Sequence, residues 1–345
     1  MLILKQLLES LKTIPTTTAW YLSDLAEARG KQELFTKQSP QRLKSLREHA
    51  LIESSVSSNR IEGVKIDGRR VGTVIFGNRM LRDRDEEEVR GYRKALDLIH
   101  TRGARLEVSE ETIKKLHQLS RGEVWDAGQY KEKNSDIIEH QPDGRTRIRF
   151  TTVSAEKTPP MMKNLTEVWE EATKTERFPP LVALANFNLD FLCIHPFRDG
   201  NGRTSRLLVL LQCYHLGFEV GRYISLERII EENKERYYQT LEQSSQGWHE
   251  GKSDPWPYIN FILSILRLGY KEFEERVGEI PKRGAKRELI TTAIDNMEGP
   301  FRIADLQRAC PGVGIDHLRK TLNALKKEKK VKCLGKGQSA EWTKI

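Results

Sequence analysis

The sequence predicts a mainly α-helical protein with one β-hairpin in its middle and a small helical module at its C-terminus. Three observations predict this fold class. Apolar side chains recur at helical spacing through most of the 345 residues, strand-like alternation is confined to short stretches, and a linker over residues 280–284 sets off the C-terminal part. Hydrophobic residues make up 37% and charged residues 31%, which is typical of a globular protein, and no run of eighteen apolar residues predicts a membrane span.

The first part of the chain, residues 1–100, is expected to form an N-terminal helical segment. Residues 42–57 and 85–100 both carry apolar side chains at helical spacing. Acidic residues open the second of these patterns, where they suit the positive end of a helix dipole. A short polar stretch over residues 57–63, closed by a glycine, lies between the two helices.

The middle of the chain, residues 101–278, is expected to form a helical core that is interrupted by a β-hairpin. The dipeptide Asp143-Gly144 is a turn signal, and residues 147–150 alternate between polar and apolar side chains. We therefore expect two antiparallel strands within residues 134–153.

Two helices of this core are expected to flank a loop. Residues 181–194 are almost wholly apolar, which predicts the central buried helix. That helix should end at His195, because the residue before a proline is pushed out of the helical conformation. A second helix begins near Gly202, and the last helix of the core covers residues 258–277.

The C-terminal residues 285–345 are expected to form a winged helix-turn-helix, because three helix-like stretches are followed by two strand candidates. The stretches are 286–297, 302–310 and 314–327, and the strand candidates are 330–334 and 340–345. Residues 281–345 hold 15 Lys and Arg against 7 Asp and Glu, whereas the first 280 hold 43 against 42. A surplus of this kind favours contact with nucleic acid, although a solvated surface has the same composition.

The basic module leaves two interpretations open. As a DNA-binding domain it would present residues of its third helix to a groove and a wing residue to phosphate, namely Asp316, His317, Arg319, Lys320 and Lys336. As a protein-binding module it would dock a partner or mediate a homodimer. A fold of this type serves both uses.

The cysteines and the start of the chain indicate a cytoplasmic protein. The four cysteines show no CxxC spacing, which argues against a zinc site or a disulfide framework. The first residues lack both the long apolar stretch and the small-residue cleavage site of a signal peptide.

The loop between the two core helices, residues 195–206, reads HPFRDGNGRTSR. The glycines allow a tight turn that exposes backbone N–H groups, and the helix that follows points its positive end into the loop. Arg203 and Arg206 share one face of its first turn. Each feature alone is more often a cap, a turn or a solvated surface. Together they predict a site for an anion with several charges, with Asp199 suited to Mg²⁺ and His195 suited to a general base.

This segment matches the Fic family motif HxFx(D/E)GNGRxxR at every specified position. The neighbouring helices and the hairpin also stand where Fic domains have counterparts. The resemblance covers roughly residues 110–265, and residues 1–95 resemble the N-terminal segment often found ahead of a Fic core. It implies a Fic-type helical core with a small β-hairpin flap.

The resemblance implies transfer of AMP from ATP to a protein hydroxyl, with Mg²⁺ bound by Asp199 and with His195 as the base that deprotonates the hydroxyl. It names no target protein, and the chain itself is one candidate. The implied phosphate site consists of the backbone N–H groups of Gly200, Asn201 and Gly202 with the Asn201 side chain at the α-phosphate, Arg203 at the β-phosphate, Arg206 at the γ-phosphate, and Thr204 and Ser205 in the same helical turn.

The hairpin would then be a flap that aligns the target segment by strand addition. Arg147, Ile148 and Arg149 would lie beside the nucleotide, and Tyr237 and Tyr238 would line the adenine pocket. Packing between helices is an equally open interpretation of the two tyrosines.

Two positions depart from the commoner Fic pattern. Lys131 stands where arginine is frequent, and Ser245 stands where an asparagine is expected near the adenine. Both leave the identity of the nucleotide open.

Residues 58–63 fit the motif (S/T)xxxE(G/N), with Ser58, Glu62 and Gly63 at its specified positions, and resemble the inhibitory helix of the family. The resemblance implies that Glu62 pairs with Arg206 and repels the triphosphate. The alternative is an ordinary acid at a helix end. In some relatives the equivalent glutamate also supports removal of AMP.

The sequence is thus interpreted as a cytoplasmic protein adenylyltransferase that uses ATP and Mg²⁺ and is autoinhibited in cis. One alternative is a Fic enzyme that uses another nucleotide or mainly removes AMP. Another is a DNA-binding regulator whose Fic core only senses a nucleotide. The intact His195 argues against the second alternative, because a sensor needs no base.

Overall fold

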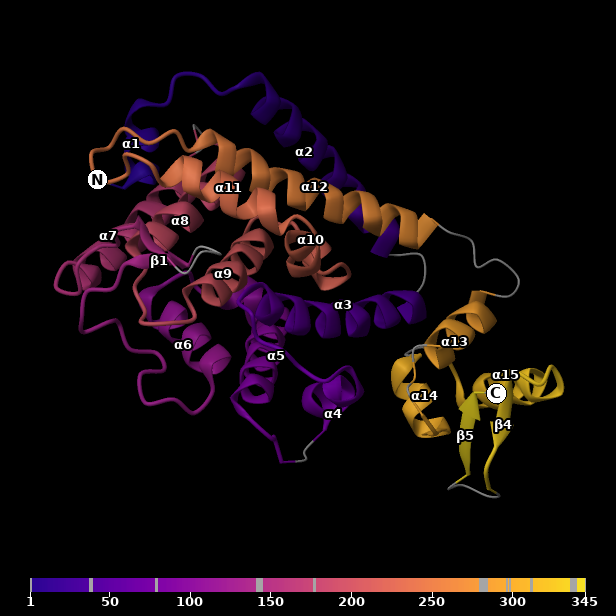
Figure 1. Cartoon of the computed structure of the whole chain (residues 1–345). Helices are drawn as coiled ribbons and strands as arrows, with labels where there is room; N and C mark the ends of the chain where they lie inside the picture. The colour runs from indigo at the N-terminus through magenta and orange to yellow at the C-terminus, as the bar shows by residue number, and fades with distance from the viewer. Residues whose placement is uncertain are drawn as a thin grey trace.

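The structure of the chain, a computed structural model, describes residues 2–36, 40–77, 80–140, 145–175, 178–278, 285–295, 297, 299–310, 313–335 and 340–344. It is mainly helical, as predicted, and has two small β-sheets (Figure 1). None of the helices in these ranges carries an apolar stretch of the length and hydropathy that a membrane span requires.

All regular elements that the structure describes before the hairpin are helices. It forms α1 (Ile3–Ser10), α2 (Thr16–Thr36), α3 (Pro40–Ile61), α4 (Val71–Phe76), α5 (Arg84–Arg102) and α6 (Glu110–Arg121), with 3-10 turns at Gly68–Arg70 and Gly103–Arg105. The acidic start of α5 behaves as expected, because the Asp83 side chain accepts a hydrogen bond from the backbone N–H of Glu86 at 2.9 Å. Helix α3 continues four residues beyond the predicted end at Ser57.

The predicted hairpin consists of β1 (Ile137–His140) and β2 (Thr146–Phe150), which pair antiparallel with Ile138 opposite Ile148. The expected turn residues Asp143 and Gly144 lie outside the described residues. The hairpin is followed by α7 (Thr158–Lys174), α8 (Pro180–Ile194), α9 (Asn201–His215), α10 (Leu226–Glu232), α11 (Lys234–Ser245) and α12 (Trp256–Gly278), with a 3-10 turn at Val220–Arg222.

Helix α8 is the centre of the molecule, as its composition predicted. Every residue from Leu181 to Ile194 is buried, and α1, α7, α9, α11 and α12 surround it (Figure 1). Asp190, in the middle of α8, accepts hydrogen bonds from the backbone N–H groups of Ile3 and Leu4 at 3.0 and 2.9 Å, which attaches the start of α1 to the core.

One hydrophobic core extends from Leu2 to Val277. Side chains of α1, α2, α3 and α5 therefore share a core with the helices around α8. Helix α5 also runs across residue 100. The expected boundary between residues 1–100 and 101–278 therefore falls inside one helix and inside one shared hydrophobic core.

The C-terminal residues have a separate core that includes Ile290, Leu306, Leu322 and Trp342. The elements are α13 (Ala285–Asp295), β3 (Phe301–Arg302), α14 (Ile303–Ala309), α15 (Ile315–Lys327), β4 (Val331–Cys333) and β5 (Glu341–Lys344), with the strands in the order β3-β5-β4. The sequence predicted all of these except β3. The expected linker at 280–284 and the wing residue Lys336 lie outside the described residues, and the winged helix-turn-helix stays a prediction.

Candidate active site

The loop between α8 and α9 is bent by two residues in the left-handed conformation. His195 has φ 54° and directly precedes Pro196, which disfavours the right-handed helical conformation. Gly200 has φ 82°, and a Cβ atom at this position would lie 2.8 Å from Cδ of Arg121. His195 therefore ends α8 where predicted, and Gly200 lets the chain enter α9 at close range to α6.

Side chains within and beneath the loop fix its shape. The backbone N–H of Phe197 donates to Oδ1 of Asn201 at 2.9 Å, and Nδ2 of Asn201 donates to the Phe197 carbonyl at 2.8 Å. The Phe197 ring stacks on His117 of α6 with ring centroids 3.7 Å apart. His117 accepts from the backbone N–H of Gly128 through Nδ1, so its Nε2 carries the proton and donates to the Asp199 carbonyl at 2.9 Å.

Lys131 holds the backbone on both sides of His195. Its backbone N–H donates to the Pro196 carbonyl at 2.8 Å, and its buried ammonium donates to the Ile194 carbonyl at 3.2 Å and to Thr152 Oγ1 at 2.7 Å. Burial lowers the pKa of Lys131 to about 8. This residue, noted from the sequence only as a departure from the Fic pattern, thus brackets the bend at His195.

The half-buried His195 has the protonation state of a base. Its Nδ1 lies 3.4 Å from the Leu192 carbonyl, which can only accept a hydrogen bond, so the proton resides on Nδ1 and Nε2 keeps its lone pair. Burial lowers the pKa of His195 to about 4, and the charge of Lys131 is the second cause. The imidazole is therefore neutral near pH 7.

Arg203 lies in a buried ionic cluster. Its side chain is 2% exposed, and its Nη1 is 2.6 Å from Oε2 of Glu88 on α5 and donates to Asn59 Oδ1 at 3.2 Å. The same Glu88 pairs with Nη1 of Arg121 at 2.5 Å, and that nitrogen is 2.9 Å from Oδ2 of Asp199. Two buried arginines thus share one buried carboxylate beneath the loop, and the exposed Arg84 is 3.1 Å from the same carboxylate.

Asp199 stands at the edge of this cluster with its side chain 54% exposed. Arg84 approaches it at 3.3 Å, in addition to Arg121. Burial raises the pKa of Asp199, but the charges of Arg121 and Arg203 lower it by more, so the net pKa lies below its usual range. The group is a carboxylate at neutral pH, with a face toward solvent.

Arg206 lies beneath the end of α3. Its Nε and Nη2 donate to the hydroxyl and the carbonyl of Ser58 at 2.9 and 2.8 Å, and Nη2 is 2.8 Å from Oε1 of Glu62. Among the described residues, its buried Nη1 has no hydrogen-bond partner. The Glu62 carboxylate also rests on Gly202, where a Cβ atom would come within 2.2 Å of Oε1. An anion thus occupies the first turn of α9.

The position of Glu62 follows from how α3 ends. The backbone N–H of Val64 donates to the Asn59 carbonyl at 3.1 Å, and that of Gly63 donates to the Arg60 carbonyl at 3.0 Å. These two bonds, with Gly63 at φ 87°, form a Schellman motif in which Glu62 is the C-cap residue. The glycine of the predicted motif therefore fixes the glutamate at the helix end.

The hairpin lies against α11. Arg147 pairs with Glu242 at 3.1 Å, and Arg149 donates to the Tyr238 carbonyl at 3.1 Å with its guanidinium 5.3 Å from the ring centroid. Ile148 is 61% exposed. The structure therefore brings the predicted flap residues next to the half-buried Tyr238.

Several side chains of the predicted phosphate site have partners within the protein. Both polar atoms of the Asn201 side chain are engaged by the loop backbone, and Arg203 is held in the ionic cluster. The hydroxyls of Thr204 and Ser205 donate to carbonyls of the preceding turn at 2.9 and 2.8 Å. These four side chains support the loop in this structure, and none is presented to an open phosphate site.

Two predicted adenine-site residues also have structural partners. Tyr237 is 3% exposed and packs against Tyr258 and Phe261. Ser245 is the last residue of α11 and donates to the Glu242 carbonyl at 3.1 Å.

Sequence reasoning missed four side chains of this region, namely Asn59, Glu88, His117 and Arg121. Glu88 had been assigned to the acidic start of a helix, and only its burial reveals the ion pairs. Asn59 lies at an unspecified position of the inhibitory motif. For His117 and Arg121 the sequence carries no signal, because they approach the loop from α6, about eighty residues earlier.

Residues 107–213 match the model of the Fic/DOC family. The chain is 34% identical over 88 residues to protein adenylyltransferase fic-1 of Caenorhabditis elegans, which is 25% of this chain and 17% of the relative. It is 25% identical over 183 residues to protein adenylyltransferase Fic of Drosophila grimshawi, which is 52% of this chain and 33% of the relative. The chain thus spans a third or less of the length of these relatives.

The fold is also similar to solved structures. A crystal structure of a Fic family protein from Desulfovibrio desulfuricans superposes with a TM-score of 0.63 at 23% identity and covers 97% of both chains. Fic-1 of C. elegans superposes with a TM-score of 0.58 at 20% identity, covering 76% of this chain and 73% of the other. The first likeness extends over nearly the whole chain.

Proposed function

This chain is a Fic domain protein, and on that premise we propose that it transfers AMP from ATP to a hydroxyl side chain of a target protein. The observation that carries the proposal is the arrangement of the motif loop. A neutral histidine stands at the end of α8, and a carboxylate occupies the N-terminal turn of α9, where backbone N–H groups attract anions. The curated relatives quoted above bear the name protein adenylyltransferase.

His195 supplies the base in this reaction. Its Nε2 takes the proton of the target hydroxyl, the hydroxyl oxygen forms a bond to the α-phosphorus of ATP, and the bond between that phosphorus and the bridging oxygen breaks. Pyrophosphate leaves with the electron pair of that bond. A pKa of about 4 keeps His195 ready to accept a proton at neutral pH.

The site of Glu62 is the proposed position of the γ-phosphate. Arg206 has one buried nitrogen without a partner in the part of the chain that the structure describes, and that nitrogen would lie 3.3 Å from a Cβ atom on Gly202. Phosphate oxygens there would meet both the guanidinium and the end of α9. Glu62 and the γ-phosphate cannot share the position, which makes Glu62 the proposed inhibitor.

Mg²⁺ fits the donor set of the loop. The ion is usually held by one or two carboxylates together with substrate phosphates, and Asp199 offers one ionised, half-exposed carboxylate beside the phosphate region. Asp199 would hold the ion, which neutralises charge on the phosphates when bound. No cluster of three potential metal ligands occurs within the described residues.

The test is transfer by a Glu62→Gly variant. The purified variant is incubated with labelled ATP, Mg²⁺ and a cell lysate, and labelled proteins are identified by mass spectrometry. We expect stronger labelling than with the parent chain, because the proposed γ-phosphate site is then vacated. Adding His195→Ala to this variant should lower labelling by about 10²–10⁴-fold while leaving its thermal unfolding unchanged.

Other results would redirect the proposal. Equal labelling with and without His195 would remove the base from the mechanism. Labelling by a different nucleotide alone would replace ATP, and loss of AMP from a modified protein in the presence of the parent chain would make de-AMPylation the main activity.

A second proposal concerns the C-terminal module, which we propose contacts nucleic acid as a winged helix-turn-helix. Asp316, His317, Arg319 and Lys320 of α15 are all exposed, as that use requires. A gel shift of the full chain with duplex DNA at two salt concentrations tests it, because phosphate contacts weaken steeply with salt. Equal mobility with and without DNA at low salt would favour a protein-binding module or a dimer contact instead.

A further inference from the structure

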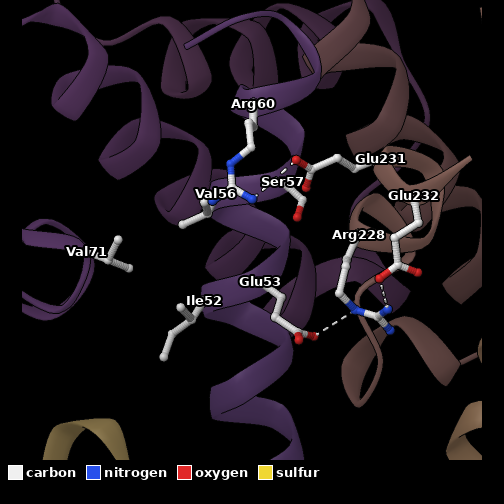
Figure 2. Close-up of a pocket in the computed structure, with 9 residues that line it drawn as sticks. All are labelled: Ile52, Glu53, Val56, Ser57, Arg60, Val71, Arg228, Glu231 and Glu232. Atoms are coloured by element: carbon white, nitrogen blue, oxygen red, sulfur yellow. Dashed lines mark hydrogen bonds and ion pairs between the residues drawn. The ribbon is translucent and has the colours of Figure 1, made fainter. Parts of the chain in front are cut away.

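Helix α3, whose end carries Glu62, is held on two faces. Its outer face forms ion pairs with α10 around a groove of about 610 Å³ (Figure 2). Arg60 lies 3.3 Å from Glu231, and Arg228 lies 3.4 Å from Glu53 and 2.7 Å from Glu232. Arg60 and Glu232 are more than half exposed, and ion pairs of exposed side chains contribute little to stability.

The inner face of α3 carries two buried serines, Ser54 and Ser58, one helical turn apart. Ser54 donates to Oε2 of Glu227 on α10 at 2.7 Å. Ser58 accepts from Nε of Arg206 at 2.9 Å. The two hydroxyls therefore connect one helix to a buried carboxylate on one side and to a buried guanidinium on the other.

Tyr92 of α5 binds the same carboxylate as Ser54. Its hydroxyl donates to Oε1 of Glu227 at 2.9 Å. The two oxygens of Glu227 thus accept hydrogen bonds from two helices, Oε2 from Ser54 of α3 and Oε1 from Tyr92 of α5.

Glu227 is 3% exposed, and within the described residues it has no ion-pair partner. A buried carboxylate of this kind requires hydrogen bonds that favour its charge, and Ser54 and Tyr92 donate them. Since Ser54 is the donor that α3 contributes, displacing α3 leaves the buried carboxylate with one hydrogen bond fewer.

We propose that Tyr92 and Glu227 are positioning residues that anchor the inhibitory helix a second time, through Ser54, independently of Glu62. This inference rests on the proposed function, because it describes how firmly α3 closes the nucleotide site. The anchor sets the fraction of molecules in which the site is open, and Glu62 blocks the γ-phosphate position in the rest.

The test removes only the tyrosine hydroxyl. Tyr92→Phe should raise the labelling rate with ATP by about 2- to 10-fold and lower the KM for ATP, since one buried hydrogen bond of the closed state is lost. In the Glu62→Gly background the same substitution should change the rate by less than about twofold, because the blocking carboxylate is already gone. Tyr214→Phe is the matched control, since Tyr214 is equally buried and bonds His100 at 2.9 Å.

A second measurement is independent of transfer. Amide hydrogen exchange over residues 54–62 should be about 2- to 10-fold faster in Tyr92→Phe than in Tyr214→Phe. Glu227→Gln, which keeps the shape of the side chain and removes its charge, should act in the same direction if Tyr92→Phe fails to fold. Unchanged exchange in both Tyr92→Phe and Glu227→Gln would overturn the anchor even if Glu62→Gly is active. Faster exchange in a chain whose Glu62→Gly variant transfers nothing would support the anchor and refute the proposed function.

Discussion

The two arginines of the motif loop, Arg203 and Arg206, lie three residues apart on α9, and each pairs with a glutamate in a different structural setting. Arg203 is held by Glu88 near the start of α5, within a cluster that also fixes the loop. Arg206 is held by Glu62 and Ser58 at the end of α3, where one side chain can leave without unfolding a helix. The comparison teaches that the same residue type at helical spacing can support a loop in one place and, under the proposed function, form a switchable contact in the other.

The largest effect is expected when the carboxylate that supports Arg203 is removed. Glu88→Gln leaves Arg203 and Arg121 buried without their shared carboxylate, which should lower the free energy of unfolding by about 3–5 kcal/mol. Urea unfolding of the purified variant measures it. Glu87→Gln, an exposed neighbour on the same helix, should stay within about 0.5 kcal/mol of the parent. If Glu88→Gln had the same free energy of unfolding as the parent and a higher rate of AMP transfer, the contact of Arg203 would be switchable as well.

The next effect concerns pH and the support beneath the loop. Burial lowers the pKa of His117 to about 4, so the unfolded chain binds a proton on this residue between pH 6.5 and 4 whereas the folded chain does not. Its contribution to stability is complete above pH 6.5 and is lost as the pH falls through that window, by about 3 kcal/mol in all.

The measurement compares urea unfolding at pH 7 and pH 4.5 for the parent chain and for His117→Gln, which does not titrate. The variant should lose less stability on acidification. The difference between the two chains is decisive because Asp190, whose pKa burial raises to about 6, acts in the opposite direction in both. Equal losses in the two chains would mean that His117 titrates normally.

A smaller effect is expected for the coupling between Glu62 and Arg206. Glu62→Gly should raise transfer, and the double variant Glu62→Gly, Arg206→Ala should be less active than Glu62→Gly alone, because the γ-phosphate then loses its own partner. The coupling free energy from the four labelling rates should exceed about 1 kcal/mol for a buried pair. Additive effects would indicate that Glu62 and Arg206 act separately despite their 2.8 Å contact.

The smallest expected effect lies outside both regions. Deleting residues 281–345 from the Glu62→Gly variant should change its self-labelling by less than about twofold, because these residues have a hydrophobic core of their own. Circular dichroism establishes that the shortened chain is folded. Loss of labelling by a folded, shortened chain would make the module part of the catalytic unit.

Much of the fold could be predicted because its signals are local. The apolar run of α8, the proline after His195 and the acidic start of α5 each act within a few residues of where they stand. The two-residue strand β3 carries no such signal, because its residues are defined by pairing with Glu341 and Trp342 forty positions later. The end of α3 was misjudged because serine and asparagine are poor helix formers, and here burial overrides their preference.

The site was predicted only as far as the motif defines it. The contact between Glu62 and Arg206 was expected from the sequence and is present in the structure. The partners of Arg203 and Asn201 were not expected, because a motif records which residue types recur and does not record whether a side chain faces a ligand or its own backbone. Tyr92 and Glu227 are separated by 135 positions, so only the fold brings them together.

The Schellman end of α3 has a consequence for the time course of the proposed inhibition. The terminal turn of a helix opens and closes within about a microsecond, whereas enzymes commonly turn over about 1–10³ times per second. If only this turn must open to free Arg206, the open and closed forms equilibrate many times within one catalytic cycle. Progress curves of labelling should then start without a lag. ATP should compete directly with Glu62 for Arg206, so the ATP concentration should set the fraction of molecules in the open form.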